Sequence, residues 1–498
     1  MGGGSPLVVG NAAAVPLRDV PEVGVVEFRA TLLDEIAQGG RVSAFFGTPC
    51  DTGSLEIVAV VARPAQQRLG LLSTVVADRY PSLTPDCPQL VNFEREIAEQ
   101  WGVHPEGHPW LKPLRRDESY RSAAASMRPP VVPFFAVEGE EVHEVAVGPV
   151  HAGIIEPGHF RFQCHGETVL HLEISLGYQH RGVETALVGG PDKRTIHYME
   201  TVAGDTTVGH ALAYARAVEA LAGREPPAGA EGLRCLALEL ERLANHAGDL
   251  GALAGDVGYL PTASFCGRLR GEFLSLTALA CGSRLGRGWI RPGGVAFDVG
   301  PRAAEMKSRL AAAMEDLRRS AGLLWNTSTV RARFEETGTL TPEIGRSLGL
   351  VGPAARASGI AEDVRRDFPC GADRRLAVRV ATWPTGDVFA RAQVRWLEAQ
   401  ESARLVDTQL AGIAEGPVYE DPGTLRSASM AVSLVEGWRG EICHVARTDE
   451  RGHFTRYKIV DPSFHNWPGL AFAMQQQSIS DFPLCNKSFN LSYCGHDL

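Results

Sequence analysis

The segment Phe160-Arg-Phe-Gln-Cys-His-Gly-Glu-Thr-Val-Leu-His-Leu-Glu-Ile-Ser-Leu176 alternates apolar and polar residues on both sides of a central turn, His165-Gly-Glu167. Alternation with a period of two places one set of side chains on one face of a strand. The segment therefore predicts a β-hairpin with one buried face.

The spacing of apolar residues lengthens beyond this hairpin. Two series recur at intervals of three and four residues, at Leu236, Leu240, Leu243, Ala247 and Leu250, and at Met306, Leu310, Met314 and Leu317. This spacing lines one face of an α-helix. Strand-like runs return at Ile442–Ala446 and Arg456–Val460. The centre of the chain is thus predicted to be a bundle of long helices with small β-sheets at its margins.

The N-terminal part has a different pattern. Residues 41–120 combine short apolar runs such as Leu55–Val61 with helix-like stretches such as Val91–Glu99, which predicts a separate α+β domain. Residues 121–138 are rich in Ser, Ala and Pro and suit an extended linker, while the Gly- and Pro-containing residues 1–40 suit a flexible lead-in. The fold class is therefore α+β, with a mainly helical second domain over residues 139–498.

Composition excludes several classes of function. The chain has 498 residues, of which 44 % are hydrophobic, and a formal net charge of −10. Acidic and basic residues are interspersed, which argues against nucleic acid as a partner. No run approaches the roughly 18 apolar residues of a membrane helix, and Met1-Gly-Gly-Gly-Ser-Pro6 lacks the features of a secretory signal. We expect a cytoplasmic chain without a membrane span.

The ten cysteines never form a Cys-x-x-Cys pair. Such pairs are typical of structural metal sites, and disulfides belong to oxidising compartments. We therefore expect most of the thiols to be buried and reduced.

Several motifs carry a family resemblance. Phe93–Lys112 resembles the signature of the 30-kDa (C-type) subunit of NADH:quinone oxidoreductase. Gly148–Phe160, followed by Leu176–Glu184, resembles the start of the 49-kDa (D-type) subunit and of the large subunit of group 4 [NiFe] hydrogenases. Trp289–Val295, Ala357–Ile360 and Asp461–Pro468 extend the match in the same order. The fusion of both parts in one chain resembles the large subunit of formate hydrogenlyase.

The resemblance implies a test for a nickel–iron centre, which needs four thiolates from two Cys-x-x-Cys motifs. The family's first pair falls on Ala203 and Thr206, and its second pair falls on Ser492 and Gly495. Cys494 lies one residue out of register. Because soft sulfur ligands retain nickel and iron, we expect no Ni–Fe centre and no metal ligands in this chain.

The quinone site of the D-type subunit is altered as well. Its tyrosine falls on Gly204 and its histidine falls on Ile155. The chain thus departs from both functional families at their active positions.

Ionisable residues nevertheless remain on the motif loops. The resemblance implies that these loops converge, and we expect Glu156, His151, Asp205 and His210 to act catalytically in proton or conformational coupling. We expect His180, Arg181 and Cys494 to contact a cofactor. The structural alternatives are a turn stabilised by His180 and Arg181, and a helix N-cap formed by Asp205, Thr206 and Thr207.

Other motifs have structural interpretations beside functional ones. Phe93–Lys112 is interpreted as a docking surface rather than a site, and Arg291–Gly294 as a tight turn. Glu239, Arg242 and His246 share one helix face, and an interhelical salt bridge is favoured there over a metal site. Two interpretations of Arg356–Arg366 remain open: the segment contacts a partner subunit or an anion, or it is a solvated helical face.

The resemblance also implies partners. These are a B-type Fe–S small subunit that carries a [4Fe–4S] cluster, a ferredoxin-like subunit and antiporter-like membrane subunits, which would hold the chain on the inner face of the cell membrane. We expect the chain to couple electron transfer from the Fe–S subunit to a quinone or proton site. The alternatives are a structural scaffold with a decayed active site and a hydrogenase with unusual ligands.

Overall fold

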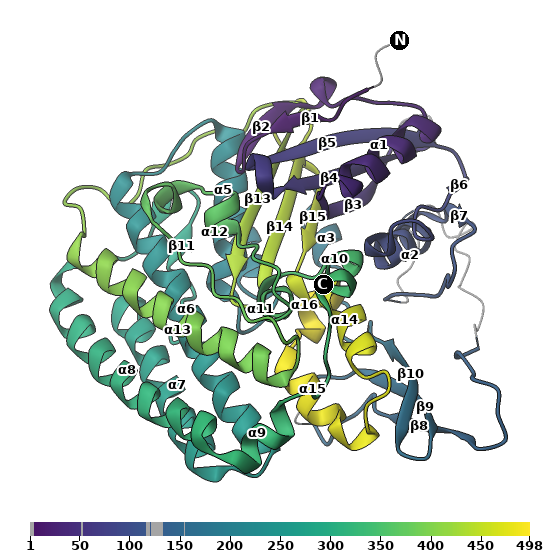
Figure 1. Cartoon of the computed structure of the whole chain (residues 1–498). Coiled ribbons are helices and arrows are strands. Elements are labelled where there is room, and N and C mark those ends of the chain that lie inside the picture. The colour runs from purple at the N-terminus through teal and green to yellow at the C-terminus, as the bar shows by residue number, and fades with distance from the viewer. Residues whose placement is uncertain (1–3, 51–52, 116–119, 121–132, 154) are drawn as a thin grey trace.

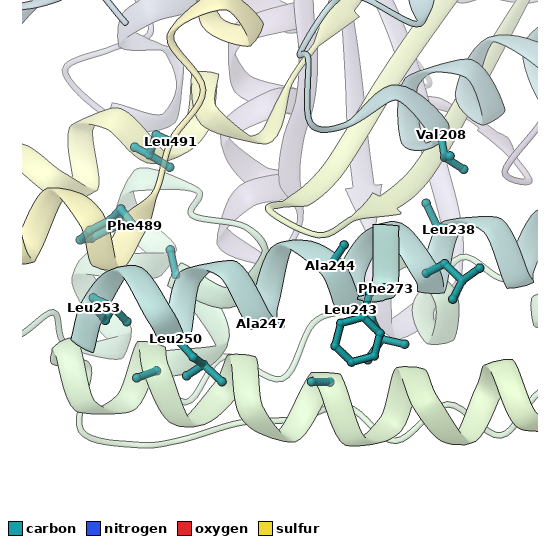
Figure 2. Close-up of a cluster of buried hydrophobic side chains, with 14 of the residues drawn as sticks. Val208, Leu238, Leu243, Ala244, Ala247, Leu250, Leu253, Phe273, Phe489 and Leu491 are labelled. Carbon is teal, nitrogen blue, oxygen red and sulfur yellow. The ribbon is translucent and has the colours of Figure 1, made fainter. Parts of the chain in front are cut away.

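Four long helices pack side by side and form the largest core of the chain (Figure 1). They are α6 (Ala228–Asp256), α7 (Leu260–Cys281), α8 (Ala303–Asn326) and α13 (Val388–Ala411). The two predicted apolar series lie on α6 and α8, and the leucines of the α6 series are completely buried. Figure 2 shows Leu243, Ala247 and Leu250 of this series along α6, with Phe489 and Leu491 of the C-terminal segment near its Leu253 end. The helix bundle expected from the spacing is confirmed.

The computed structural model describes residues 4–50, 53–115, 120, 133–153 and 155–498. Within this part of the chain, no helix has the length and apolarity that crossing a membrane requires. Eight of the ten cysteines are buried there, as expected, and all ten are free thiols.

A four-stranded antiparallel sheet lies next to the bundle. Its order is β15-β14-β13-β2, with β13 (Ser429–Gly437), β14 (Gly440–Thr448), β15 (Phe454–Val460) and β2 (Ala13–Pro16). The helix α5 (Thr207–Ala222) packs against β13 and β14. The strand-like runs near residues 442 and 456 are therefore confirmed as β14 and β15.

The N-terminal domain contains a second four-stranded sheet in the order β1-β5-β4-β3. The strands are β1 (Leu7–Val9), β5 (Arg68–Val76), β4 (Leu55–Arg63) and β3 (Arg41–Pro49), and α1 (Val25–Ala37) and α2 (Val91–Trp101) accompany them. The strand expected at Leu55–Val61 and the helix expected at Val91–Glu99 are both present. Together the two domains confirm the α+β class.

The expectation of a flexible lead-in over residues 1–40 is wrong for its described part. β1 pairs with β5 of the N-terminal sheet, whereas β2 pairs with β13 of the second sheet. Asn11 lies between these strands, and its buried amide exchanges hydrogen bonds with the backbone of Leu434 and donates another to Phe368 O at 2.8 Å. Both pairings join residues far apart in sequence, so no local pattern reveals them.

The two domains share a core and several ion pairs. One hydrophobic cluster combines residues of the N-terminal sheet with Met430, Val445 and Phe464 of the second domain. Lys458 Nζ lies 2.7 Å from the Glu96 carboxylate of α2, within the predicted docking block. This block therefore contacts the second domain of its own chain. Residues 121–132 of the predicted linker lie outside the described residues.

The predicted hairpin forms a third sheet, in the order β10-β9-β8, with β8 (Val142–Val147), β9 (His159–His165) and β10 (Thr168–Ser175). The Pro292-Gly293 turn joins β11 (Ile290–Arg291) to β12 (Gly294–Val295), and Gly293 has a φ of +89°, as a tight turn requires. The remaining strands are β6 (Arg79–Pro81) and β7 (His104–Glu106).

Short helices connect these parts. They are α3 (Val183–Ala186), α4 (Thr195–Met199), α9 (Ser328–Phe334), α10 (Pro342–Leu348), α11 (Gly352–Ala357), α12 (Val364–Asp367), α14 (Pro462–Ala473), α15 (Phe482–Phe489) and α16 (Tyr493–Asp497). Single 3-10 turns are η1 (Leu17–Asp19), η2 (Pro64–Gln66), η3 (Pro88–Leu90), η4 (Gly300–Arg302), η5 (Gly371–Arg375) and η6 (Ile479–Asp481). The last helices bring the C-terminal residues back to the middle of the molecule (Figure 1).

Candidate functional site

The two loops that correspond to the family's metal motifs meet in the structure, and an arginine joins them. Arg439 lies at the tip of the β13–β14 hairpin. Its guanidinium donates to both carboxylate oxygens of Asp205, at 2.5 and 2.8 Å, and to the backbone oxygen of Asn490. We call Asp205, Thr206, Arg439 and Asn490 the Arg439 site.

An aromatic ring supports this arginine. The Arg439 guanidinium carbon lies 3.9 Å from the ring centre of Trp438, and the Trp438 indole donates to Thr206 Oγ1 at 3.1 Å. Burial favours the neutral form of Asp205, but the guanidinium outweighs it and lowers the pKa of this carboxyl group below its usual range. The site therefore holds a fixed carboxylate and a fixed cation.

The N-cap interpretation of this motif is confirmed for the position of Thr206 but not for a side-chain cap on α5. Thr206 occupies the N-cap position without a side-chain capping bond. The Glu241 carboxyl group of α6 instead accepts from the amides of Val208 (2.7 Å) and Gly209 (3.1 Å). Burial raises the pKa of Glu241 to about 8, although both amides act in the opposite direction.

The four positions on which the resemblance places the family's thiolates, Ala203, Thr206, Ser492 and Gly495, carry no thiol. Ser492 accepts from the Gly495 amide at 2.9 Å and caps α16. Cys494 Sγ lies 3.4 Å from Ser492 Oγ, and burial, with a smaller contribution from Glu156, raises the pKa of this thiol to about 11. It is thus protonated at neutral pH and a poor metal ligand.

The donor set does not fit a nickel–iron centre. Hydroxyl and carboxylate oxygens are hard ligands, and the Arg439 cation would repel a metal ion. No group of three or more His, Cys, Asp or Glu residues in the described ranges has the geometry of a metal site.

The structure brings three of the predicted site residues together. The Glu156 carboxylate accepts from the Cys494 amide at 3.4 Å. Arg181 donates to the backbone oxygens of Val202 (2.9 Å) and Cys494 (3.0 Å). The motif loops therefore converge on the C-terminal segment.

His180 and His151 make backbone contacts. His180 Nδ1 lies 2.7 Å from Asp497 O, and His151 Nε2 lies 2.8 Å from Gly158 O in its own loop. The Arg181 amide also donates to Leu498 O at 2.7 Å. Among these contacts, those of His180 and Arg181 correspond to the structural alternative of a stabilised turn.

His210 lies apart from these loops, completely buried beneath them. Its Nε2 lies 3.0 Å from Asp461 Oδ2, and its Nδ1 lies 3.1 Å from His444 Nε2. Sequence reasoning missed His444, Tyr457 and Arg439. A signal was available, because His444 shares the buried face of its predicted strand with Ile442, and a polar residue on such a face needs a hydrogen-bond partner.

A buried ion network lies behind the site. Arg242 Nε lies 3.1 Å from Glu239 on α6, and His246 Nε2 lies 2.8 Å from Glu398 on α13. The salt-bridged interhelical contact predicted for this helix face is confirmed. Burial raises the pKa of Glu398, but Arg356 and His246 outweigh it, so the pKa lies below the usual range.

Neither interpretation of the Arg356–Arg366 segment holds for two of its three arginines. Arg356 and Arg365 are buried, and they pair with Glu398 (2.7 Å) and Glu239 (2.9 Å). They are therefore neither solvated nor accessible to a partner. Arg366 is partly exposed.

Comparison with known proteins agrees with this architecture. Residues 29–129 match the family described as respiratory-chain NADH dehydrogenase, 30 Kd subunit, and residues 256–429 match the 49 Kd subunit of the same enzyme. Formate hydrogenlyase subunit 5 of Escherichia coli (strain K12) is 28 % identical over 480 residues, which cover 92 % of this chain and 84 % of that protein.

Two further relatives match about two thirds of this chain. The carbon monoxide-induced hydrogenase of Rhodospirillum rubrum is 30 % identical over 350 residues, or 70 % of this chain and 97 % of that protein. A D-type component of the NADH-quinone oxidoreductase of Herpetosiphon aurantiacus is 30 % identical over 352 residues, or 68 % of this chain and 94 % of that protein.

A solved structure shows the same fold. A chain of the membrane-bound sulfane sulfur reductase, an archaeal respiratory membrane complex, superposes with a TM-score of 0.67 at 22 % identity and covers 72 % of this chain and 99 % of that chain. The motif order, the two family matches and the relatives lead to one assignment. The chain belongs to the family of fused 30-kDa and 49-kDa subunits of the NADH dehydrogenase type, which is homologous to formate hydrogenlyase subunit 5 and to the large subunits of group 4 hydrogenases.

Proposed function

We propose that this chain is the large peripheral subunit of a membrane-associated oxidoreductase complex in which the Arg439 site replaces the nickel–iron centre and receives a quinone-class acceptor. The observation that carries the proposal is the double contact of Arg439, which pairs with Asp205 and donates to Asn490 O and so links the two loops on which the resemblance places the family's thiolates. The relatives named above, as hydrogenase and NADH-quinone oxidoreductase components, support the general role of an oxidoreductase subunit.

The chemistry of the site suits such an acceptor. A quinone carbonyl oxygen gains negative charge when electrons arrive, and a prearranged guanidinium stabilises charge at that position. The buried Trp438 ring lies against the guanidinium and helps to fix the cation in place. Electrons would come from a [4Fe–4S] cluster in a B-type partner subunit.

Exposed apolar residues support docking of that partner. Val150, Ile155 and Tyr178 lie on the motif loops and are 77, 41 and 40 % exposed. Exposed apolar side chains on these loops are candidates for a contact with a partner subunit. A ferredoxin-like subunit and antiporter-like membrane subunits would complete the complex, on the inner face of the cell membrane.

Quinone reduction by the purified complex tests this proposal. Decylubiquinone is the probe, and Arg439→Gln is compared with Arg331→Gln, which alters an arginine paired with Glu335 at the surface. We expect Arg439→Gln to lower the rate at least tenfold, within the range known for a lost charge-stabilising donor, and Arg331→Gln to leave it unchanged. Equal rates in both variants, or nickel at one atom per chain, would overturn the proposal.

A structural scaffold with a decayed site is the second candidate. The observation in its favour is that Arg439 already has partners on both loops, Asp205 and Asn490, so the pair alone could hold the loops together. A complex that assembles, contains its clusters and reduces no quinone would establish this second function.

A further inference from the structure

Four completely buried side chains form a continuous hydrogen-bonded line behind the Arg439 site. Asp461 Oδ2 lies 3.0 Å from His210 Nε2, His210 Nδ1 lies 3.1 Å from His444 Nε2, and His444 Nδ1 lies 2.9 Å from Tyr457 Oη. Each of the four residues is at most 1 % exposed. They come from α5, β14, β15 and the residue before α14, so the line exists only in the folded chain.

Asp461 is the end that faces the site. It caps α14 by accepting from the Ser463 amide at 2.8 Å, and Ser463 Oγ accepts from the Ser492 amide at 2.8 Å. Burial raises the pKa of Asp461, but His210 and Arg439 outweigh it, so the group is a carboxylate. The line thus begins against the C-terminal motif segment.

The positions of the protons follow from the partners. A carboxylate only accepts, so His210 Nε2 carries a proton. Burial and the neighbouring His210 lower the pKa of His444 well below its usual value, so this ring is neutral. In the arrangement in which His210 carries one proton, on Nε2, His444 Nε2–H donates to His210 Nδ1 and the Tyr457 hydroxyl donates to His444 Nδ1. Every donor in the line therefore points toward Asp461.

We propose that Tyr457, His444, His210 and Asp461 form a proton relay that supplies one proton to the acceptor at the Arg439 site. Three protons each move by one hydrogen bond: from Tyr457 Oη to His444 Nδ1, from His444 Nε2 to His210 Nδ1, and from His210 Nε2 to Asp461 Oδ2. Asp461 becomes a neutral acid, Tyr457 becomes a phenolate, and both imidazoles stay neutral. Asp461 then gives its proton to the acceptor. This inference rests on the proposed function.

The line of hydrogen bonds ends inside the protein at Tyr457, so it holds one proton in reserve and does not conduct protons from solvent. The rings of Phe454 and Tyr214 pack around Tyr457, at 5.1 and 6.4 Å between ring centres, and Cys443 lies nearby. In the described part of the chain, the Tyr457 hydroxyl has His444 as its hydrogen-bond partner. The proton must therefore return by the same path, and after the shift every donor points back toward Tyr457, so the return needs no ring rotation.

The energetics couple the relay to electron transfer. Burial raises the pKa of Tyr457 well above its usual value, so its phenolate is costly. Only a strong base draws the proton out, and a quinone becomes one after it has received two electrons. The relay then delivers its proton after reduction and not before.

Two variants test the relay in the purified complex. Tyr457→Phe removes the terminal hydroxyl, and Tyr214→Phe is the matched control, since Tyr214 is likewise buried but lies outside the line. We expect Tyr457→Phe to lower kcat for decylubiquinone reduction about tenfold to a hundredfold, near the lower range of general acid catalysis, with KM unchanged and with a changed solvent deuterium isotope effect. Equal kcat values in both variants would overturn the relay.

A second measurement tests the relay without measuring quinone reduction. Nitrogen-15 NMR of histidine-labelled complex reads the tautomer of each ring. We expect both His210 and His444 to carry a proton on Nε2 and none on Nδ1, and Tyr457→Phe to shift the His444 signals while Tyr214→Phe leaves them in place. A proton on Nδ1 of either ring would refute the relay, whereas wild-type complex that reduces no quinone but shows these tautomers would refute only the proposed function.

Discussion

Gly495 lies so close to Asp461 that a Cβ atom added to it would meet Asp461 Cγ at 2.7 Å. The resemblance places the family's last metal-ligand position at Gly495, and Asp461 is the site-facing end of the buried line. A side chain at residue 495 is therefore excluded by the carboxylate that the line uses.

Gly495→Ala is expected to destabilise the chain by about 1–3 kcal/mol, because a methyl group must displace a buried carboxylate. Gly267→Ala is the control, since Gly267 lies within α7 and nothing lies within 4 Å of an added Cβ. That variant should gain up to about 1 kcal/mol from helix propensity. Urea unfolding of both variants measures the difference, and equal shifts would contradict the close contact.

Asn11→Ala is expected to lower the free energy of unfolding by about 2–4 kcal/mol. The change leaves the amide and oxygen of Leu434 and the oxygen of Phe368 without their buried partner. Gln38→Ala removes an exposed bond to Asp34 and should stay within about 0.5 kcal/mol of wild type. If the two variants unfold at the same urea concentration, the N-terminal segment does not contribute as described.

Glu241 should make stability fall as the pH rises. Its folded pKa of about 8 exceeds the value near 4.3 of an unfolded glutamate, so the native state binds the extra proton between these values. This contribution is complete below about pH 4 and is lost as the pH rises toward 8, with a slope of up to about 1.4 kcal/mol per pH unit. Glu241→Gln should flatten the pH dependence of unfolding between pH 5 and 8. An unchanged slope would mean that the two amides at the start of α5 keep the group ionised.

Glu156→Gln is expected to slow quinone reduction by the assembled complex, if the loop glutamate transfers protons beside Cys494. Glutamine keeps the oxygen that accepts from the Cys494 amide but cannot carry a proton. Glu141→Gln, at a highly exposed carboxylate, is the control. Unchanged activity in Glu156→Gln would count against the proton-transfer role.

Local sequence patterns were sufficient to predict helices with a regular apolar spacing and strands that pair with the next strand in the sequence. The α6 series at Leu236 to Leu250 has the helical period, and the strand runs at residues 442 and 456 have turn residues between them. The motifs also predicted correctly that the loops around Glu156, Arg181 and Cys494 meet.

The same local patterns could not predict which strands pair when the two strands lie far apart in the sequence. β2 finds its partner in β13, more than 400 residues later, and the short run Ala13–Pro16 has no alternation that would indicate a strand. The burial of Arg356 was hidden for a similar reason, because charge in a sequence suggests solvent until the paired Glu398 is known. Arg439 was missed because its role depends on two loops that approach it from both ends of the second domain.

The pairing of β2 with β13 has a consequence for how the chain is made. At a synthesis rate of about 5–20 residues per second, residue 13 leaves the ribosome on the order of 20–80 seconds before residue 429 is added. Throughout that interval the partner strand of β2 does not yet exist, so the backbone N–H and C=O groups of residues 13–16 lack their strand partners. Such unpaired backbone groups can pair with other chains, and binding by chaperones or early assembly partners would prevent this.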